Sequence, residues 1–433
     1  MVVGDVKIWG QRVGAIFWDV QNQLGSFEYY PSFIKQSVDL APLTMPIDEN
    51  PQIYSFPKNR PDRDSEYDTF KGLPGLIADS LPDKYGNQLI NVWLAQQGRP
   101  SDSMNPIEKL CFIGNRGMGA LEFEPAFDKE INSTFELEIK SLVEITSQML
   151  AKREQFHTDS SEDQLAAVTA ILRLGTSAGG ARAKALIAYN VATGEVKSGQ
   201  GSVPKGYEHF LIKLDGVHDA QFGTSSGYGR VEMAYYYMAI DCGINMMPCY
   251  LLEENGRAHF LTQRFDRTER NTKHHIQTWC AMEHFDFTQV GAYSYEQLFQ
   301  TMRMLRLPFP QAKQMFRRMI FNVVARNCDD HTKNFAFRLK QGKDWEITPA
   351  YDICYAYDPR SIWVSQHNIS INGKLKDIQR EDLIKVGKSI NISRPELIID
   401  EIVAIVKEWD KYSEKANVSK ILHQKIKSSH LYI

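Results

Sequence analysis

The chain has 433 residues, of which 43% are hydrophobic and 24% are charged, so it is long enough for two or three domains with buried cores. Its formal net charge of −3 gives no strong global field that favours phosphate, which argues against a free-standing nucleic-acid-binding protein. The six cysteines form no CxxC pair and no regular spacing, which predicts free thiols in a reducing compartment.

The N-terminal end and the hydropathy of the chain bear on its location. The first residues contain an acid and no long apolar run, and no eighteen consecutive residues are apolar. We therefore expect no signal peptide, no transmembrane helix and no membrane partner, which makes the cytoplasm the expected location by default.

Residues 1–150 are predicted to form a small module of a β-meander followed by helices. Apolar and aromatic residues alternate over residues 6–33, which is the spacing of antiparallel strands. Helices are expected over residues 85–97 and 137–150. A polar linker over residues 152–161 marks the boundary with the next domain. No obvious catalytic chemistry lies in this region, which favours a packing module.

Residues 151–265 are predicted to form a lobe around a glycine-rich loop. Gly179 and Gly180 would let backbone N–H groups approach phosphate oxygens, while Arg182 and Lys184 supply positive charge before a strand over residues 185–190. The loop has neither the Lys-Ser/Thr pair of a Walker A loop nor the GxGxxG pattern. A flexible lead-in to a hairpin is therefore the alternative interpretation.

A lysine inside an apolar strand is the second feature of this lobe. Lys213 lies in the strand predicted over residues 208–215. A strand lysine that faces a cleft can hold the inner phosphates of a nucleotide, but an edge-strand lysine that faces solvent is common. A helix over residues 231–242 and a hairpin over residues 249–261 follow. The chain then leaves this hairpin through a segment where an adenine ring could meet backbone groups.

Residues 266–433 are predicted to form a helical lobe around one polar loop. An amphipathic helix over residues 311–327 precedes the loop, and a hairpin with strands near residues 335–339 and 345–347 follows it. Asp329 and Asn334 have the separation of the Asp and Asn in a kinase catalytic loop, and Asp352 is placed like the second metal-binding Asp. Magnesium prefers such hard oxygen ligands. The alternative is a polar loop in which Asp caps a turn and Asn is left-handed.

The rest of this lobe is expected to be mainly helical. Helices are predicted over residues 294–305, 380–388 and 394–412, a strand pair over residues 362–371, and a frayed or helical end over residues 419–433. Three histidines and a cysteine suggest zinc, but their spacing fits no closed four-ligand pattern; they are His274, His275, Cys280 and His284.

Taken together, these motifs resemble the HipA family, the serine/threonine kinase toxins of bacterial toxin–antitoxin pairs, over nearly the whole chain. The motifs that carry the resemblance are LPGLIADSLPD (73–83), GTSAGGARAKA (175–185), EHFLIKL (208–214), RFDR (264–267), DDHTKNF (329–335) and TPAYDI (348–353). The resemblance implies an α+β, two-lobed protein-kinase-like fold with an N-terminal β/α module and a mostly helical C-terminal lobe.

The resemblance also implies roles for individual residues. Asp329 would be the base, Asn334 and Asp352 would hold Mg²⁺, and Ser177 matches the position that family members autophosphorylate to turn themselves off. Lys213 would contact the ATP phosphates. Other residues would complete the ATP site: Ala178, Gly179, Gly180, Ala181, Arg182, Lys184, Gln263, Arg264, Phe265, His331, Lys333, Asn334, Tyr351 and Asp352. Asp330 is a departure, because some members carry Gly there, and it leaves two candidates for the base.

The family's partners give a further set of expectations. The usual substrate is a protein hydroxyl, with glutamyl-tRNA synthetase the known example, and the usual partner is the helix-turn-helix antitoxin HipB on its operator DNA. Lys374, Lys376 and Arg380 could touch that DNA, although a solvated basic face explains them as well. Two alternatives remain open: a small-molecule kinase of similar lobes, and a non-catalytic corepressor that bridges antitoxin dimers.

Overall fold

The computed structural model describes residues 2–57, 68–101, 103–126, 139–151, 183–199, 201–219, 223–224 and 226–433. By its internal contacts the chain divides into two units, one of residues 1–229 and 250–276, the other of residues 230–249 and 277–433. The domain boundaries that the sequence predicts at residues 150 and 265 stay predictions.

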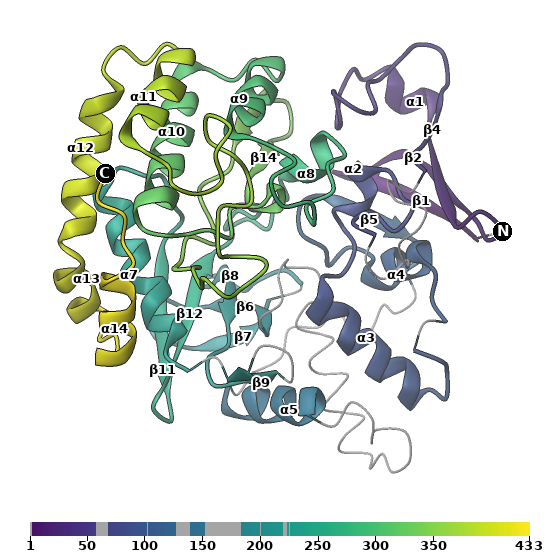
Figure 1. The fold of residues 1–433 in the computed structure, drawn as a ribbon. Helices are drawn as coiled ribbons and strands as arrows, with labels where there is room; N and C mark the ends of the chain where they lie inside the picture. Colours follow the sequence, from purple (N-terminus) through teal and green to yellow (C-terminus); the bar gives the residue numbers. More distant parts are fainter. Residues whose placement is uncertain are drawn as a thin grey trace. The chain divides into compact units, whose positions relative to one another are not determined.

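An antiparallel sheet of five strands begins the first unit, in the order β4-β3-β2-β1-β5 (Figure 1). Its strands are β1 (Val2–Ile8), β2 (Gln11–Asp19), β3 (Leu24–Tyr29), β4 (Ile53–Ser55) and β5 (Leu121–Glu124). The predicted strands are confirmed, but the inward face of β2 is not the expected one. Beyond Val13 the buried side chains are Ile16 and Trp18, whereas Ala15 and Phe17 are only partly buried. The edge strand β5 pairs with β1, although the two lie far apart in the sequence.

A second five-stranded sheet of the first unit has the order β11-β12-β8-β6-β7. Its strands are β6 (Lys184–Tyr189), β7 (Val196–Ser198), β8 (Glu208–Lys213), β11 (Cys249–Glu254) and β12 (Arg257–Gln263), and a short pair is formed by β9 (His218–Asp219) and β10 (Gly223–Thr224). The strands predicted over residues 185–190 and 208–215 and the hairpin over 249–261 are therefore confirmed.

The helices described in the first unit pack on these strands. They are α1 (Pro31–Ile34), α2 (Gly75–Ala78), α3 (Lys84–Gln96), α4 (Pro106–Ile113) and α5 (Ile139–Ala151). Leu89 of α3 and Leu142 of α5 belong to the same buried cluster as Ile187 of β6 and Phe210 of β8. One core thus joins helices of the predicted N-terminal module to the strands of the predicted small lobe. Both helices predicted here from periodicity are confirmed.

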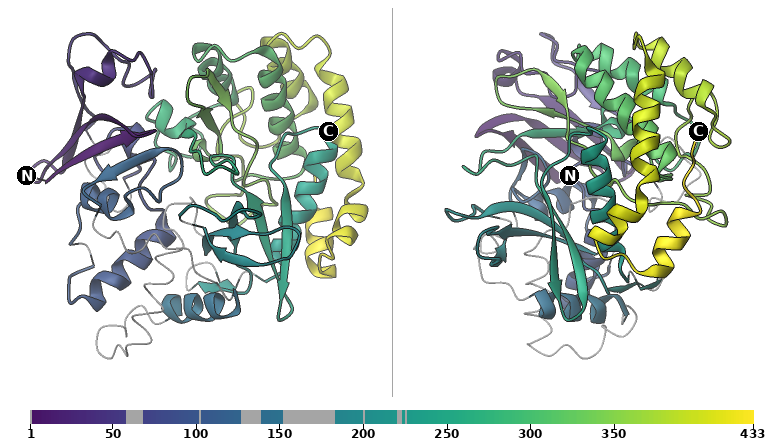
Figure 2. Two further views of the ribbon diagram at one scale, coloured as in Figure 1. Left: turned by 180° about the vertical axis from the view of Figure 1, so that it is seen from behind. Right: turned by 90° about the vertical axis from the view of Figure 1, so that its left-hand side faces the viewer.

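The second unit is mainly helical. Its described helices are α7 (Tyr228–Asp241), α8 (Trp279–Met282), α9 (Tyr295–Met304), α10 (Phe309–Val324), the 3₁₀ turn η3 (Thr332–Asn334), α11 (Arg380–Ser389), α12 (Pro395–Lys407), α13 (Trp409–Lys415) and α14 (Lys420–Lys427). The C-terminal helices lie beside α7 and α10 in both views of Figure 2. Tyr235 of α7 packs edge-to-face on Trp409, with 5.8 Å between ring centroids.

The predicted hairpin after the polar loop is confirmed as β14 (Ala336–Leu339) paired with β15 (Trp345–Ile347). A further strand, β13 (His275–Thr278), runs from the end of the first unit into the second. None of the described helices combines the length and the apolar character that crossing a membrane requires.

Two predictions for this unit are wrong. Residues 362–371 form no strand pair and contain only isolated bridges, because their backbone bonds to the polar loop instead, as in the Asn368 N–H donated to Asp330 Oδ1. The helix predicted over residues 394–412 is two helices, α12 and α13, which meet at Glu408. A periodic apolar stripe continues across that break, so periodicity alone could not reveal it.

Candidate active site

The polar loop after α10 is held against the loop that carries Asp352. The chain turns out of α10 at Arg326, whose φ of 58° is left-handed. Cys328 N then donates to Ala356 O at 2.9 Å, and Ala356 N donates to Arg326 O at 3.1 Å. The Tyr351 hydroxyl donates to Lys333 O at 2.7 Å. The two loops that the sequence singled out therefore lie side by side within one unit.

The two neighbouring aspartates of the loop have opposite environments. Asp329 has a side chain that is 50% exposed, and its carboxylate lies 3.8 Å from His331 Nε2. Asp330 is buried and accepts three hydrogen bonds, from Tyr295 Oη at 3.0 Å, His367 Nδ1 at 2.8 Å and Asn368 N at 2.8 Å. Of these two carboxylates, only that of Asp329 is accessible to a substrate hydroxyl.

Asp330 belongs to a buried network that fixes the loop. Asn322 of α10 donates to the Tyr295 hydroxyl at 3.0 Å and accepts from Asn327 Nδ2 at 3.0 Å. Asn327 Nδ2 also lies 3.3 Å from Asp352 O, and Asn368 Nδ2 donates to Cys328 O at 2.8 Å. Because each of these buried polar groups has a hydrogen-bond partner, the network holds the loop in one conformation.

The His367 imidazole is the positive partner of Asp330. Burial lowers its pKa, but the Asp330 carboxylate outweighs that effect and raises the pKa of His367 to about 10. His367 is therefore an imidazolium at neutral pH, and it forms a buried ion pair with Asp330.

The oxygen donors suit a hard divalent cation. Asn334 Nδ2 donates to Asp329 O at 2.6 Å, which leaves the amide oxygen as the Asn334 atom that can act as a ligand. Asp352 takes a left-handed φ of 51°, which Asp adopts more readily than most residues. One carboxylate and one amide oxygen fit magnesium, which keeps water and phosphate oxygens in the rest of its shell.

His331 and Lys333 share an aromatic neighbour. The Phe287 ring lies 5.3 Å from the His331 ring between centroids, and Lys333 Nζ lies 4.5 Å from the Phe287 centroid. The two side chains are thereby held on one side of the loop by a ring that the sequence did not single out.

The predicted phosphate-binding residues of the first unit are only partly described. Residues 178–182 and Ser177 lie outside the described residues. Lys184 on β6 and Lys213 on β8 are directly opposite each other in the sheet. Lys184 is 6% exposed, with its Nζ 3.5 Å from the Asp83 carboxylate, and Lys213 Nζ lies 5.8 Å from the Phe260 ring centroid. Their roles toward a nucleotide stay predictions.

The segment predicted to meet adenine is held by backbone and side-chain hydrogen bonds. Gln263 donates to Glu208, and Arg264 N donates to His209 O at 2.8 Å. The Arg264 guanidinium is buried on Asp266, with two hydrogen bonds of 2.9 and 2.7 Å. That side chain is thus structural, and a nucleotide contact from this segment would have to come from its backbone, as the sequence predicts for residues 263–265.

Asp266 gives a test of acid stability. Burial raises its pKa, but Arg264 and Arg267 hold the pKa of this carboxyl well below its usual range. A depressed folded-state pKa contributes stability that is present above about pH 4 and is lost as the pH falls further. We expect Asp266→Asn to lower the free energy of unfolding by roughly 1–3 kcal/mol at pH 7 and by less at pH 3. Urea unfolding at both pH values measures this difference.

The control for that experiment is Glu49→Gln, which changes an exposed carboxylate of the same unit. It should leave the free energy of unfolding nearly unchanged at both pH values. A loss for Asp266→Asn that is as large at pH 3 as at pH 7 would contradict the assignment.

Comparison with known families decides the identity of the chain. A model described as the HipA-like C-terminal domain matches residues 176–409, and one described as the HipA N-terminal domain matches residues 4–124. The chain belongs to the HipA family.

One solved structure agrees with this assignment at the level of the fold, and a second match is weaker. HipA of Shewanella oneidensis MR-1, in a complex with HipB and its operator DNA, aligns over 98% of this chain and 94% of that chain with a TM-score of 0.66 and 14% identity. The Helicobacter pylori proinflammatory kinase CtkA aligns over 52% of this chain and 89% of that chain, with a TM-score of 0.31 and 11% identity. No curated protein sequence matches. The resemblance and the α+β fold class are confirmed.

The structure of this chain also shows site residues that the sequence did not reveal. They are Phe287, Tyr295, Asn322, His367 and Asn368, all of which contact the polar loop or its partners. Asn322 had a signal in the sequence, because it is a polar residue among the apolar residues of α10. His367 and Asn368 had none, because they bond to a residue far away along the chain.

Other residues that the sequence analysis raised have ordinary contacts in this HipA-family chain. Lys374 pairs with Asp382 at 2.7 Å, Arg380 pairs with Asp400 at 2.7 Å, and Lys376 is exposed. Contact of these three with DNA stays a prediction. Of the residues weighed for zinc, Cys280 donates its Sγ–H to Phe285 O. No group of three or more His, Cys, Asp or Glu is arranged to hold a metal ion in the part of the chain that is described.

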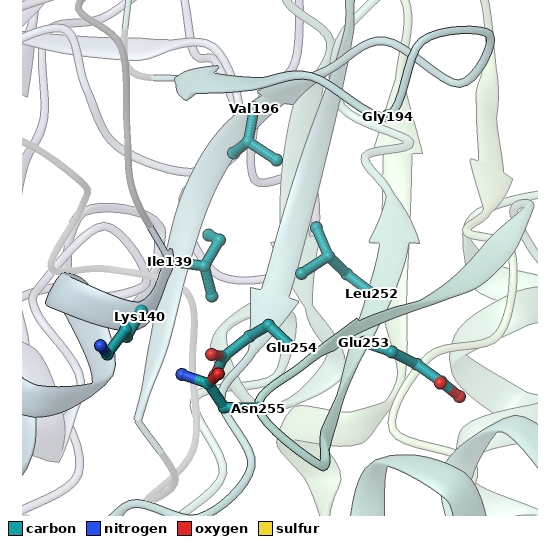
Figure 3. Close-up of a pocket in the computed structure, with 8 residues that line it drawn as sticks. All are labelled: Ile139, Lys140, Gly194, Val196, Leu252, Glu253, Glu254 and Asn255. Carbon is teal, nitrogen blue, oxygen red and sulfur yellow. The ribbon is translucent and has the colours of Figure 1, made fainter.

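An open pocket of the first unit is lined by none of the predicted site residues (Figure 3). It lies between the start of α5 and the β11–β12 hairpin, and its lining residues are Ile139, Lys140, Gly194, Val196, Leu252, Glu253, Glu254 and Asn255. Its apolar residues are few and its charges are of both signs, so it does not identify a ligand.

Proposed function

We propose that this HipA-family chain is an ATP- and magnesium-dependent protein serine/threonine kinase that acts as the toxin of a toxin–antitoxin pair. One observation carries the proposal: the exposed Asp329 lies on a loop that Tyr351 ties to the loop of Asp352, and the Asn334 amide donates to the Asp329 carbonyl within that loop. A base and two oxygen donors on adjoining loops are what phosphoryl transfer requires.

The proposed step is an in-line transfer. The substrate hydroxyl oxygen bonds to the γ-phosphorus of ATP, the bond from that phosphorus to the β–γ bridging oxygen breaks, and Asp329 takes the hydroxyl proton. Bound magnesium would neutralise phosphate charge, held by Asn334 Oδ1 and Asp352. Lys213 would contact the inner phosphates. Since little covalent chemistry falls to the protein, positioning and charge stabilisation supply most of the rate.

The partners are proposed from the family. The S. oneidensis HipA was solved with HipB and operator DNA, which supports a HipB-like antitoxin, and operator DNA through it, as partners of this chain. We propose a cytoplasmic protein substrate such as glutamyl-tRNA synthetase, whose phosphorylation would inhibit translation, and autophosphorylation at Ser177. A corepressor role beside the antitoxin is compatible with the kinase role.

The test is the intact mass of the purified chain after incubation with ATP and magnesium. A kinase of this family gains phosphate on protein, and Ser177→Ala removes the part that is placed on Ser177. ATP turnover without any phosphoprotein would favour a small-molecule kinase. No turnover, together with a tight and salt-sensitive operator complex, would favour a non-catalytic corepressor.

Tyr351→Phe tests the tie between the two loops. The ring stays and the bond to Lys333 O is lost, which removes about 1 kcal/mol of support for the Asp352 loop. We expect a roughly fivefold rise in the magnesium concentration that gives half the maximal rate. Titration of the ATP-dependent phosphorylation rate with magnesium measures it.

The matched control is Tyr357→Phe. Tyr357 lies on the same loop and contacts the Arg326 guanidinium through its ring, at 3.8 Å from the centroid, which phenylalanine preserves. Equal magnesium dependence in both variants would show that the Tyr351 hydroxyl does not support the site.

A further inference from the structure

The segment of residues 353–366 leaves the Asp352 loop and returns to the catalytic loop. Its start is fixed by the backbone bonds of Ala356 to Arg326 and Cys328. Beyond its end, His367 and Asn368 bond to Asp330. Both ends of the segment are therefore anchored on the residues around Asp329.

The tip of this segment carries two exposed apolar side chains. Ile362 is 79% exposed and Trp363 is 49% exposed. A single exposed apolar residue needs no explanation, but an adjacent isoleucine and tryptophan beside a candidate active site indicate a contact surface. Tryptophan in particular supplies a large contact area at a low cost in conformational entropy.

Trp363 is tied to the residue that precedes Asp329. Asn368 Nδ2 donates to Cys328 O at 2.8 Å and to Trp363 O at 3.1 Å. The two carbonyl oxygens therefore lie no further apart than the sum of these two distances. The backbone of the exposed pair is thus held beside the backbone that leads directly into the exposed carboxylate of Asp329.

The segment keeps its shape without help from these two side chains. The Ser361 hydroxyl accepts from Trp363 N at 3.1 Å and from Val364 N at 3.3 Å. Asp358 N donates to Val364 O at 3.3 Å, and Arg360 pairs with Asp358 at 3.1 Å. Because backbone and polar groups hold the loop, the exposed apolar atoms are available to a partner.

We infer that Ile362 and Trp363 form a docking surface for the polypeptide that carries the acceptor hydroxyl. The substrate class is then a protein segment with an apolar side chain within a few residues of its serine or threonine. The inference rests on the proposed kinase function and deepens it by naming what flanks the acceptor.

The experiment uses the full chain with ATP, magnesium and peptide mixtures that hold one central serine and fix one flanking position at a time. We expect the wild-type chain to prefer a large apolar residue at one flanking position. Trp363→Ala and Ile362→Ser should each lower kcat/KM for the preferred peptides by about tenfold, mainly through KM, and lower it much less for peptides with a polar residue there.

Ile421→Ser is the matched control, because Ile421 is 83% exposed on α14, outside the segment. It should keep the peptide preference of the wild type. Thermal unfolding should be similar in all three variants, since each changes an exposed side chain.

The possible results distinguish a failure of the docking surface from a failure of the proposed kinase function. Peptide phosphorylation with no flanking preference, or with a preference that Trp363→Ala retains, overturns the docking surface and leaves the kinase in place. Absence of any phosphorylated peptide or protein overturns both. Loss of self-association by Trp363→Ala in light scattering, with an unchanged peptide preference, assigns the surface to a second copy of the chain and overturns the inference.

Discussion

Replacement of Asp329 by alanine is expected to lower the rate of phosphate transfer to protein by about 10²–10⁴-fold, because the variant loses the group that takes the hydroxyl proton. Asp329→Asn should lose nearly as much, since an amide keeps the shape but not the basicity. The Asp329 side chain is half exposed, so neither variant should unfold the protein. Phosphate incorporation into protein measures the rate.

Asp352→Ala tests the proposed magnesium ligand on the second loop. It removes a proposed magnesium ligand and should also lower the rate by several orders of magnitude. Asp344→Ala is the control, because Asp344 is exposed in the turn between β14 and β15. Near-normal rates for both Asp329→Ala and Asp352→Ala would reject the kinase assignment, whereas a loss in Asp344→Ala would point to a general effect on folding.

The parts of this site that the sequence predicted are those encoded over short distances. The spacing of Asp329 and Asn334, the change from helical to strand period after them, and the position of Asp352 beyond a hairpin all lie within one short stretch. Because α10 and the β14–β15 hairpin form where the local pattern predicts them, the stretch between them is placed as expected.

The parts that the sequence did not predict depend on contacts between distant residues. The ion pair of Lys184 with Asp83 joins two predicted domains, and no local pattern in either segment predicts it. The strand pair expected over residues 362–371 failed for the same reason, because those residues find hydrogen-bond partners in the catalytic loop. Tertiary contacts overrode a weak local preference for strand.

The choice between the two neighbouring aspartates shows what the structure adds. In the sequence, the spacing to Asn334 favours Asp329 as the base and Asp330 is a second candidate, and their different depth in the fold separates the two. Asp330 is buried among Tyr295, His367 and Asn368, which satisfy both of its oxygens. It positions the loop from within and leaves its neighbour to face solvent.

Asp330→Ala is therefore expected to destabilise the fold by about 3–5 kcal/mol, because it leaves the buried His367 imidazolium without its partner. Asp330→Asn should cost less, since an amide can still accept the hydrogen bond from Asn368 N. Urea unfolding of the wild-type chain and both variants at pH 7 measures the losses. A loss for Asp330→Ala below about 1 kcal/mol, the size expected of an exposed pair, would contradict this account.

The contribution of His367 also fixes a pH dependence of opposite sign to that of Asp266. Its folded-state pKa of about 10 lies above the usual value near 6.5, so its stabilisation is complete below about pH 6.5 and is lost as the pH rises through about 10. The difference in unfolding free energy between the wild-type chain and His367→Gln should therefore shrink from pH 6 to pH 10. If it stays constant over that range, His367 is neutral in the folded chain. The bond to Asp330 is then an ordinary hydrogen bond, and the loop is held by hydrogen bonds to Asp330 without an ion pair.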